Sequence, residues 1–240
     1  LNSVAHEPVG VSGSPGGAWS FDVSGGLTLI GPAVTAWPGA QVVMVPGDPV
    51  DDGRVFIASK ATDLGGGVWR YEYAVYNHDM AAAVGAFGVP VSPARTVTGV
   101  GFHAVRSHDE PFSNEQWVDM RTSEGVLWST DLFDVNPGAN PLRWGTTYTF
   151  WFDADAAPGE VSATIDPYFP GGSAVSARVV GPEGCAADIN HDGVLDLADV
   201  QGFIAAFVTQ DPVADLAPPF GVFDLGDLQM FIASFAAGCP

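Results

Sequence analysis

Basic side chains are scarce in this chain. Its 240 residues include 28 Asp and Glu but only 8 Lys and Arg, which gives a formal net charge of −20, and Lys60 is the only lysine. A surface this acidic repels phosphate groups and anionic lipid headgroups. We therefore expect no nucleic-acid partner, and we expect metal cations, dissolved salt or a basic protein to supply the counter-charge.

Long apolar segments are absent too. No stretch approaches the roughly 18 to 20 uninterrupted apolar residues of a membrane-spanning helix, so the sequence predicts no membrane span. The chain begins at Leu1 without a methionine, and no basic flank followed by an apolar run comes after it. We expect that an export signal has been removed or that the sequence is a fragment of a longer one.

Apolar residues and turn formers are plentiful. Hydrophobic residues make up 47% of the chain and aromatic residues 11%, alongside 30 Gly and 19 Pro. The hydrophobic content excludes a disordered tail, and the glycine and proline content favours many turns over long helices. A chain of this length can form one large domain, or a larger and a smaller one.

Alternation with a period of two dominates the first 182 residues. Residues 69–76 and 147–153 carry mostly aromatic side chains at every second position, which is typical of strands. Weaker strand candidates lie at residues 27–30, 41–45, 55–61, 84–89, 96–105, 117–121, 126–129, 161–165 and 174–180, between Gly- and Pro-rich turns. About eleven short strands without a helical period predict a mainly β fold, an antiparallel β-sandwich.

The composition changes at the segment Gly181-Pro182-Glu183-Gly184. The last 56 residues hold eight Asp but no Glu, Lys or Arg, whereas charges of both signs occur before them. Two differently built modules therefore meet at a short Gly/Pro joint. We predict a β-sandwich domain over residues 1–182 and a small helical module over residues 183–240.

This tail repeats itself. Residues 196–207 and 224–235 are related by a shift of 28 positions, and eight of the twelve residues are identical. Apolar residues in each copy recur at the i, i+3, i+4 and i+7 spacing of one helix face. The two sets are Val200, Phe203, Ile204 and Phe207, and Leu228, Phe231, Ile232 and Phe235. We expect two short helices to bury these stripes against each other, because neither is long enough to be stable alone in water.

Oxygen-bearing side chains precede the first helix at a characteristic spacing. Counted from Asp188 as position 1, they fall at positions 1, 3, 5, 9 and 12, and Gly193 falls at position 6, where the loop must turn sharply. This is the ligand pattern of an EF-hand calcium loop, with Asp in place of Glu at position 12. Asp199 at position 12 would open and cap the helix, and Leu195 would be the inward apolar anchor. The predicted site consists of Asp188, Asn190, Asp192, the carbonyl of Val194, Asp196 and Asp199.

The second copy of the loop is less complete. Asp224 and Asp227 fill positions 9 and 12, but Leu216 stands at position 1 and Asp215 lies one residue too early. One inserted residue would bring Asp215 into place, and backbone carbonyls such as that of Val222 could replace missing carboxylates. We predict a second, weaker calcium site at Asp215, Val222, Asp224 and Asp227. The alternatives are an Asp-rich capping turn at the first loop and a proline-stiffened turn at the second, both without metal.

Neither loop has room for an entering helix, so the tail consists of two loop–helix units. This duplicated module resembles a dockerin domain, a calcium-dependent module that docks secreted proteins onto cohesins, over roughly residues 185–240. It is most similar to the Gly-Cys-bracketed variant at the C-termini of secreted bacterial proteins, here with Gly184-Cys185 and Gly238-Cys239 as the brackets. Residues 55–156 also look like an uncharacterised domain that accompanies such dockerins, which implies no activity.

The resemblance implies a protein interface at positions 10 and 11 of the two loops. These positions are Leu197, Ala198, Leu225 and Gly226. Cellulosomal dockerins often carry Ser or Thr there, so we do not expect a cellulosomal partner. The four residues instead form a neutral apolar strip between acidic loops, and exposed apolar strips often mark interfaces.

The only two cysteines, Cys185 and Cys239, stand at the two ends of the module. We predict a disulfide between them, with two unrelated thiols as the alternative. Closing a loop of this size would stabilise the module by about 4 kcal/mol in the chain-entropy account. A disulfide also implies an oxidising compartment.

No set of residues points to catalysis, and we predict that the protein is not an enzyme. It has no Gly-x-Ser-x-Gly, His-Glu-x-x-His or P-loop motif, although its many Asp and Glu leave a glycosidase pair open. His103, His108, Asp109 and Glu110 form the densest polar cluster and could hold a metal, but such histidines are usually solvated. The seven Trp could form a sugar-stacking platform, but in an all-β domain most are core.

We therefore expect a secreted, non-enzymatic protein, extracellular or at the cell surface. Its calcium-binding module would attach it to a protein partner or to copies of itself, as a structural, surface-layer or filament subunit. The alternatives are a carbohydrate-binding module and a glycoside hydrolase fragment, whose ligand would be an extracellular glycan.

Overall fold

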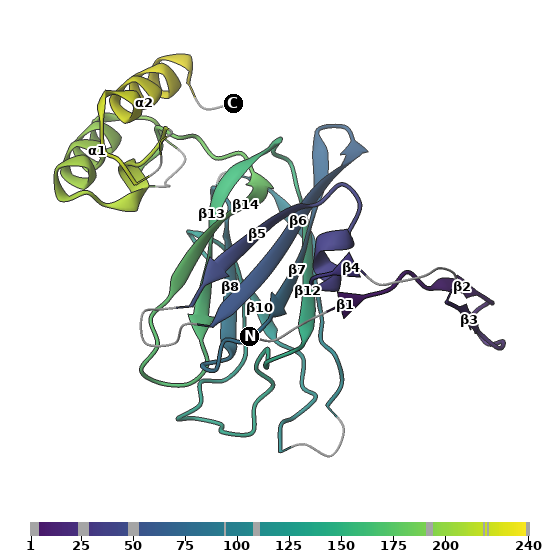
Figure 1. Ribbon diagram of the computed structural model, residues 1–240. Coiled ribbons are helices and arrows are strands. Elements are labelled where there is room, and N and C mark those ends of the chain that lie inside the picture. Colours follow the sequence, from purple (N-terminus) through teal and green to yellow (C-terminus); the bar gives the residue numbers. More distant parts are fainter. Residues whose placement is uncertain are drawn as a thin grey trace.

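A computed structural model describes residues 5–23, 29–47, 53–93, 95–107, 111–190, 194–217, 219 and 221–238. The strands between residues 5 and 182, called the β region below, lie to one side of two C-terminal helices (Figure 1). Residues 183–238 form the C-terminal region. None of the described helices is long and apolar enough to cross a membrane.

Two five-stranded antiparallel sheets make up most of the β region. One has the order β10 (Val118–Arg121), β11 (Gly125–Ser129), β8 (Val84–Pro90), β13 (Pro158–Pro167) and β14 (Val175–Pro182). The other has the order β5 (Gln41–Pro46), β6 (Arg54–Gly65), β7 (Val68–Asn77), β12 (Thr147–Ala154) and β9 (Val97–His103). Each strand beyond residue 40 lies at a segment that the sequence predicts as a strand.

The alternation in the sequence decides which side chains are buried. Along β12, Tyr148, Phe150 and Phe152 are buried and the residues between them are only partly buried. The β6–β7 hairpin closes at Gly65, Gly66 and Gly67, all with positive φ, which glycine adopts without steric cost.

Aromatic side chains from both sheets form one core. Phe87 on β8 lies with its ring centroid 4.9 Å from that of Phe150 on β12, and Trp128 on β11 lies 5.4 Å from the same ring. A smaller cluster on the outer side of β7 contains Tyr76 and Val34, which belongs to the 3-10 helix η1 (Ala33–Ala36).

Three short N-terminal strands were not expected from the sequence. They are β1 (Ala5–His6), β2 (Gly10–Ser12) and β3 (Ser20–Asp22), and β1 pairs with β4 (Leu29–Ile30). The β2–β3 hairpin projects away from the rest of the chain, and both of its strands are exposed (Figure 1). Their Gly- and Ser-rich sequence has too few apolar residues for the period of two to be visible.

The C-terminal region contains α1 (Leu197–Thr209), the 3-10 helix η2 (Pro212–Ala214) and α2 (Leu225–Ala237). The expectation that Asp199 opens the first helix was wrong. The helix begins two residues earlier, because Asp196 accepts a hydrogen bond from Ala198 N–H and so acts as the N-cap, while Asp199 completes a capping box from the third helical position.

The expectation that the two helical stripes bury each other holds for only part of them. Phe203 and Phe231 are buried and stack with a centroid distance of 4.2 Å. Ile204 and Ile232 are each 56% exposed. Because the helices are in contact along a narrow seam, the residues at i+4 turn out of it.

Candidate metal loops

The first loop is built around the carboxylate of Asp199, which is completely buried. Its Oδ1 accepts hydrogen bonds from the backbone N–H groups of Ile189 (2.9 Å) and Asn190 (3.3 Å), and its Oδ2 accepts one from that of Asp196 (2.9 Å). One side chain thus ties the start of the loop to the start of α1.

The second loop repeats this arrangement. The Oδ1 of Asp227, also completely buried, accepts hydrogen bonds from Leu216 N–H (2.7 Å) and Ala217 N–H (2.9 Å), and its Oδ2 accepts one from Asp224 N–H (2.9 Å). Leu216 and Ala217 therefore correspond to Ile189 and Asn190 of the first loop.

This correspondence locates the inserted residue that the sequence predicts. Since Leu216 matches Ile189, Asp215 matches Asp188 at position 1, and the extra residue lies after Ala217. Asp188 is 3% exposed and Asp215 is 7% exposed. The insertion therefore keeps the first carboxylate of the second loop buried at the same place as that of the first.

The carboxylate of Asp215 is only partly satisfied. Its Oδ2 accepts a hydrogen bond from Gly221 N–H (2.7 Å), where positive φ turns the chain, but its buried Oδ1 has no hydrogen-bond partner among the residues that the structure describes. A buried carboxylate oxygen without a partner is costly unless a cation or a proton compensates it. The residues of this loop thus fit a hard cation, which prefers carboxylate oxygens.

The pKa of Asp227 reflects the backbone N–H groups that donate to its buried carboxylate. Burial raises the pKa of this carboxyl, but the hydrogen bonds from the backbone N–H groups of Asp224, Ala217 and Leu216 outweigh burial and hold its pKa below the usual value. The group therefore stays ionised and keeps the loop closed at neutral pH.

The other predicted ligands are more open. Asn190, Val194 and Asp196 in the first loop, and Val222 and Asp224 in the second, are exposed, while Asp192 lies outside the described residues. Asp224 caps α2 by accepting a hydrogen bond from Gly226 N–H, as Asp196 does for α1. Within the described ranges, no three His, Cys, Asp or Glu side chains gather closely enough to form a metal site by themselves.

The helix pair holds both loops in place through one small core. Leu195 and Phe223, at position 8 of the two loops, pack against the cluster that contains Phe203 and Phe231. The expectation that Leu195 is an inward anchor is confirmed, and Phe223 is its counterpart.

Cys185 lies beside the last turns of α2. Its Sγ is 3.9 Å from Ser234 Oγ, and it is disulfide-bonded. Cys239, the only other cysteine of the chain, lies outside the described residues. The pairing of these two cysteines therefore stays a prediction.

The interface candidates differ in exposure. Leu197 is 67% and Leu225 64% exposed, and Ala198 is exposed as well, whereas Gly226 is partly buried. The exposed apolar surface extends beyond them to Ile204 and Ile232. Each repeat therefore presents one equivalent apolar residue at the start of its helix and one in its middle.

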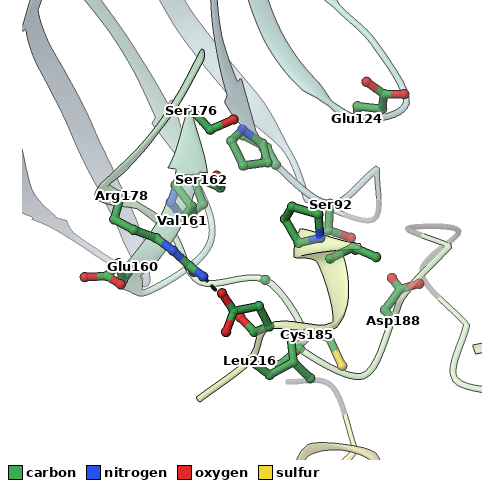
Figure 2. Close-up of a pocket in the computed structure, with 18 of the residues that line it drawn as sticks. Ser92, Glu124, Glu160, Val161, Ser162, Ser176, Arg178, Cys185, Asp188 and Leu216 are labelled. Atoms are coloured by element: carbon green, nitrogen blue, oxygen red, sulfur yellow. Dashed lines mark hydrogen bonds between the residues drawn. The ribbon is translucent and has the colours of Figure 1, made fainter. Parts of the chain in front are cut away.

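The C-terminal region meets the β region at a cavity of about 550 Å³ (Figure 2). Arg178 on β14 points across the joint, and its Nη2 donates a hydrogen bond of 3.1 Å to the backbone carbonyl of Asp215 (Figure 2). No motif in the sequence marks this arginine. Only the tertiary structure brings a basic residue of the β region to the start of the second loop.

The tryptophans that could form a sugar-stacking platform differ in exposure. Trp117 and Trp128 are buried, and Trp19 and Trp144 are about half exposed, at 50% and 57%. His108, Asp109 and Glu110 lie outside the described residues, so the proposed cluster with His103 stays a hypothesis.

Comparison with known proteins does not extend this description. A scan against protein-family models found no match, and a search of curated proteins found none either.

Proposed function

We propose that this is a secreted, non-enzymatic protein in which a β-sandwich carries a dockerin-like module of residues 183–240. The module binds calcium at both loops and attaches the protein to a protein partner or to further copies of itself. The two sheets with a shared core support the β-sandwich, and the paired loop–helix units support the module.

The unsatisfied Oδ1 of Asp215 is the observation that carries the calcium proposal. Asp188 and Asp215 place one buried carboxylate at the start of each loop, in a region with eight Asp and no Lys or Arg. Without a cation, their mutual repulsion opposes folding. Asp188, Asn190, Asp196 and Asp199 in the first loop, and Asp215 and Asp224 in the second, would supply ligands, and the bound ion would compensate this charge.

The exposed apolar residues on both helices support the proposal that the module attaches to a partner. Leu197, Leu225, Ile204 and Ile232 are all more than half exposed. Apolar side chains that recur at equivalent positions of two repeats offer a surface for a partner, whereas scattered ones do not.

The calcium proposal is tested by calorimetric titration of the intact protein. We expect two bound ions in the native chain and one in each of the variants Asp188→Ala and Asp215→Ala, because each substitution removes the first ligand of one loop. Asp119→Asn, at an exposed position on β10, is the charge-matched control and should still bind two ions. An unchanged stoichiometry in both loop variants would show that calcium does not bind here.

The attachment proposal is tested by sedimentation and electron microscopy in calcium. The double variant Leu197→Asp, Leu225→Asp should lose assembly or partner capture while calcium stoichiometry is kept. Leu132→Asp with Val135→Asp is the control, since both residues are exposed in the β region and the added charge is the same. If the control loses assembly equally, or if the helix variant retains it, the interface is not on these helices.

A further inference from the structure

A second cavity, of about 310 Å³, lies in the β region far along the chain from the calcium loops. Five of its seven described lining residues are polar and none is a carboxylate: His103, Ala104, Val105, Arg106, Asn114, Gln116 and Asn140. The volume lies within the range of about 300–1,000 Å³ that is usual for small-molecule sites. The lack of a carboxylate among these described lining residues is unexpected in a chain with a net charge of −20.

Two asparagines brace the walls of this pocket. Asn114 accepts a hydrogen bond from Ser107 N–H (2.6 Å) and donates one to Ser107 O (3.1 Å), which ties its loop to the segment after β9. The buried Asn140 accepts a hydrogen bond from Tyr148 OH (2.7 Å) and donates one to Glu115 O (2.8 Å). Both side-chain amides are thus used to hold the backbone.

An aromatic cluster lies next to the lining residues in the sequence, since Phe102 precedes His103 and Trp117 follows Gln116. Trp117 stacks on Phe102 at a centroid distance of 5.4 Å and an interplanar angle of 16°, and Tyr148 meets both rings edge-on. The indole N–H of Trp117 donates a hydrogen bond to Asn140 O. Residues whose backbone is fixed in this way hold a binding site without a large loss of entropy when a ligand arrives.

Three polar side chains of the lining are left without an internal role. His103, Arg106 and Gln116 make no side-chain hydrogen bond, ion pair or ring contact with any described part of the chain. Each of the seven Lys and Arg side chains other than Arg106 makes such an interaction. Arg54 and Arg70 pair with carboxylates, Arg95, Arg121 and Arg178 donate to carbonyl oxygens, and Lys60 and Arg143 lie over aromatic rings. Within the described part of the chain, Arg106 is therefore the Lys or Arg side chain that is available to an external ligand.

We propose that this pocket binds a sugar acid, that is, a carboxylate on a polyhydroxylated ring, as found in uronic acid units of acidic polysaccharides. The guanidinium of Arg106 offers the paired N–H donors that a carboxylate accepts. His103 and Gln116 can each donate and accept a hydrogen bond, as ring hydroxyl groups require. Ala104 and Val105 are the apolar members of the described lining, and the five polar residues outnumber them, which favours a polar ligand over a hydrophobic one.

The negative net charge of the protein repels an approaching anion at long range, but it does not prevent binding once the anion is in contact with the pocket. Exposed charges more than a Debye length apart, about 8 Å at physiological salt, are largely screened. Among the described lining residues none carries a negative charge, and the guanidinium of Arg106 is the cationic group that an anion in the pocket would contact. We therefore expect weak, saturable binding that is measured best at physiological salt.

NMR titration of the full-length protein with methyl β-D-glucuronide tests the proposal. The indole N–H of Trp117 and the backbone amides of Arg106 and Gln116 should shift in a saturable way. Methyl β-D-glucoside, which replaces the carboxylate by a hydroxymethyl group, should bind at least about tenfold more weakly, as expected for the loss of a charge-assisted hydrogen bond. Acetate, which lacks the ring hydroxyls, should also bind at least about tenfold more weakly.

Variants separate the pocket from the general charge of the protein. Arg106→Gln should weaken glucuronide binding at least about tenfold, and Gln116→Ala should weaken it by a smaller factor. Both should keep the native melting temperature, because both residues are exposed and neither side chain makes a hydrogen bond, ion pair or ring contact with a described residue. Arg95→Gln changes the net charge equally and should bind as the native chain does. Equal binding of the glucoside or of acetate, or unchanged binding by Arg106→Gln, would overturn the proposal.

Discussion

At the scale of single residues, an ion pair between Arg54 and Asp79 links two neighbouring strands. Arg54 at the start of β6 donates hydrogen bonds through its backbone N–H (2.7 Å) and its side chain to Asp79, which follows β7. The side chains of Arg54 and Asp79 are 32% and 20% exposed, so the pair is partly shielded from water. It joins the beginning of one strand to the end of its neighbour.

We expect Asp79→Asn to lower the free energy of unfolding by about 1–3 kcal/mol at neutral pH, because it removes a charged acceptor of several hydrogen bonds. The hydrogen bonds and charge of Arg54 hold the pKa of Asp79 below its usual value. The stabilisation is therefore complete above the unfolded-state pKa of about 3.9 and is lost as pH falls through the lower folded-state pKa.

Urea denaturation at several pH values measures this effect. The difference between the native chain and Asp79→Asn should shrink as the pH falls below about 4. Asp119→Asn, at an exposed position, serves as the control and should leave stability nearly unchanged. A difference that is constant with pH would show that the ion pair does not stabilise the fold.

At the scale of elements, the two C-terminal helices are stabilised by a seam and not by full apolar faces. Phe203 and Phe231 stack at an interplanar angle of 12°, and Phe207 and Phe235 each lie against one of them. Their neighbours Ile204 and Ile232 point outwards. Each helix has only 13 residues, so its stability depends on this seam.

The adjacent residues Phe203 and Ile204 allow a direct test of the seam. Phe203→Ala should destabilise the C-terminal region by about 3–5 kcal/mol, because it removes a buried ring and leaves a cavity. Ile204→Ala should change stability by less than about 0.5 kcal/mol, because its side chain is mainly exposed. Thermal unfolding followed by circular dichroism measures both, and similar losses for the two variants would contradict the observed packing.

At the scale of the whole molecule, the negative charge is distributed unevenly. Every Lys and Arg lies in the β region, and Arg178 brings a basic group to the C-terminal region through its contact with the Asp215 carbonyl. The C-terminal region also has a small core. It depends on the loops, on the helix seam and on the bond formed by Cys185.

We expect Cys185→Ser to lower the stability of the C-terminal region by about 2–5 kcal/mol while the β region keeps its melting temperature. The native chain should also be two hydrogen atoms lighter by intact mass than the reduced chain, in a monomeric species. Ser234→Ala removes the side chain beside Cys185 and is the matched control, with little expected effect. A free thiol or a disulfide-linked dimer would contradict the predicted pairing with Cys239.

The strands beyond residue 40 could be predicted from the sequence because burial on one face imposes a period of two that survives in residues such as Tyr148, Phe150 and Phe152. The hairpin of β2 and β3 could not, since it has no buried face to impose a pattern. The two loop–helix units could be predicted because residues 196–207 repeat at 224–235 in the sequence, and calcium binding at the loops stays a prediction. Asp196 was missed as the N-cap, because both Asp196 and Asp199 are good caps and only the hydrogen bonds distinguish them.

The sequence of neighbouring residues thus determined the strands, the loop–helix repeat and the candidate calcium ligands, because each is encoded within about one turn or one strand. Tertiary structure alone decided how much of each helical stripe is buried, where the insertion in the second loop falls and that the Oδ1 of Asp215 lacks a described partner. It also brought His103, Arg106 and Gln116 to one pocket. These features depend on contacts between segments that are distant in sequence, and no periodicity or spacing records such contacts.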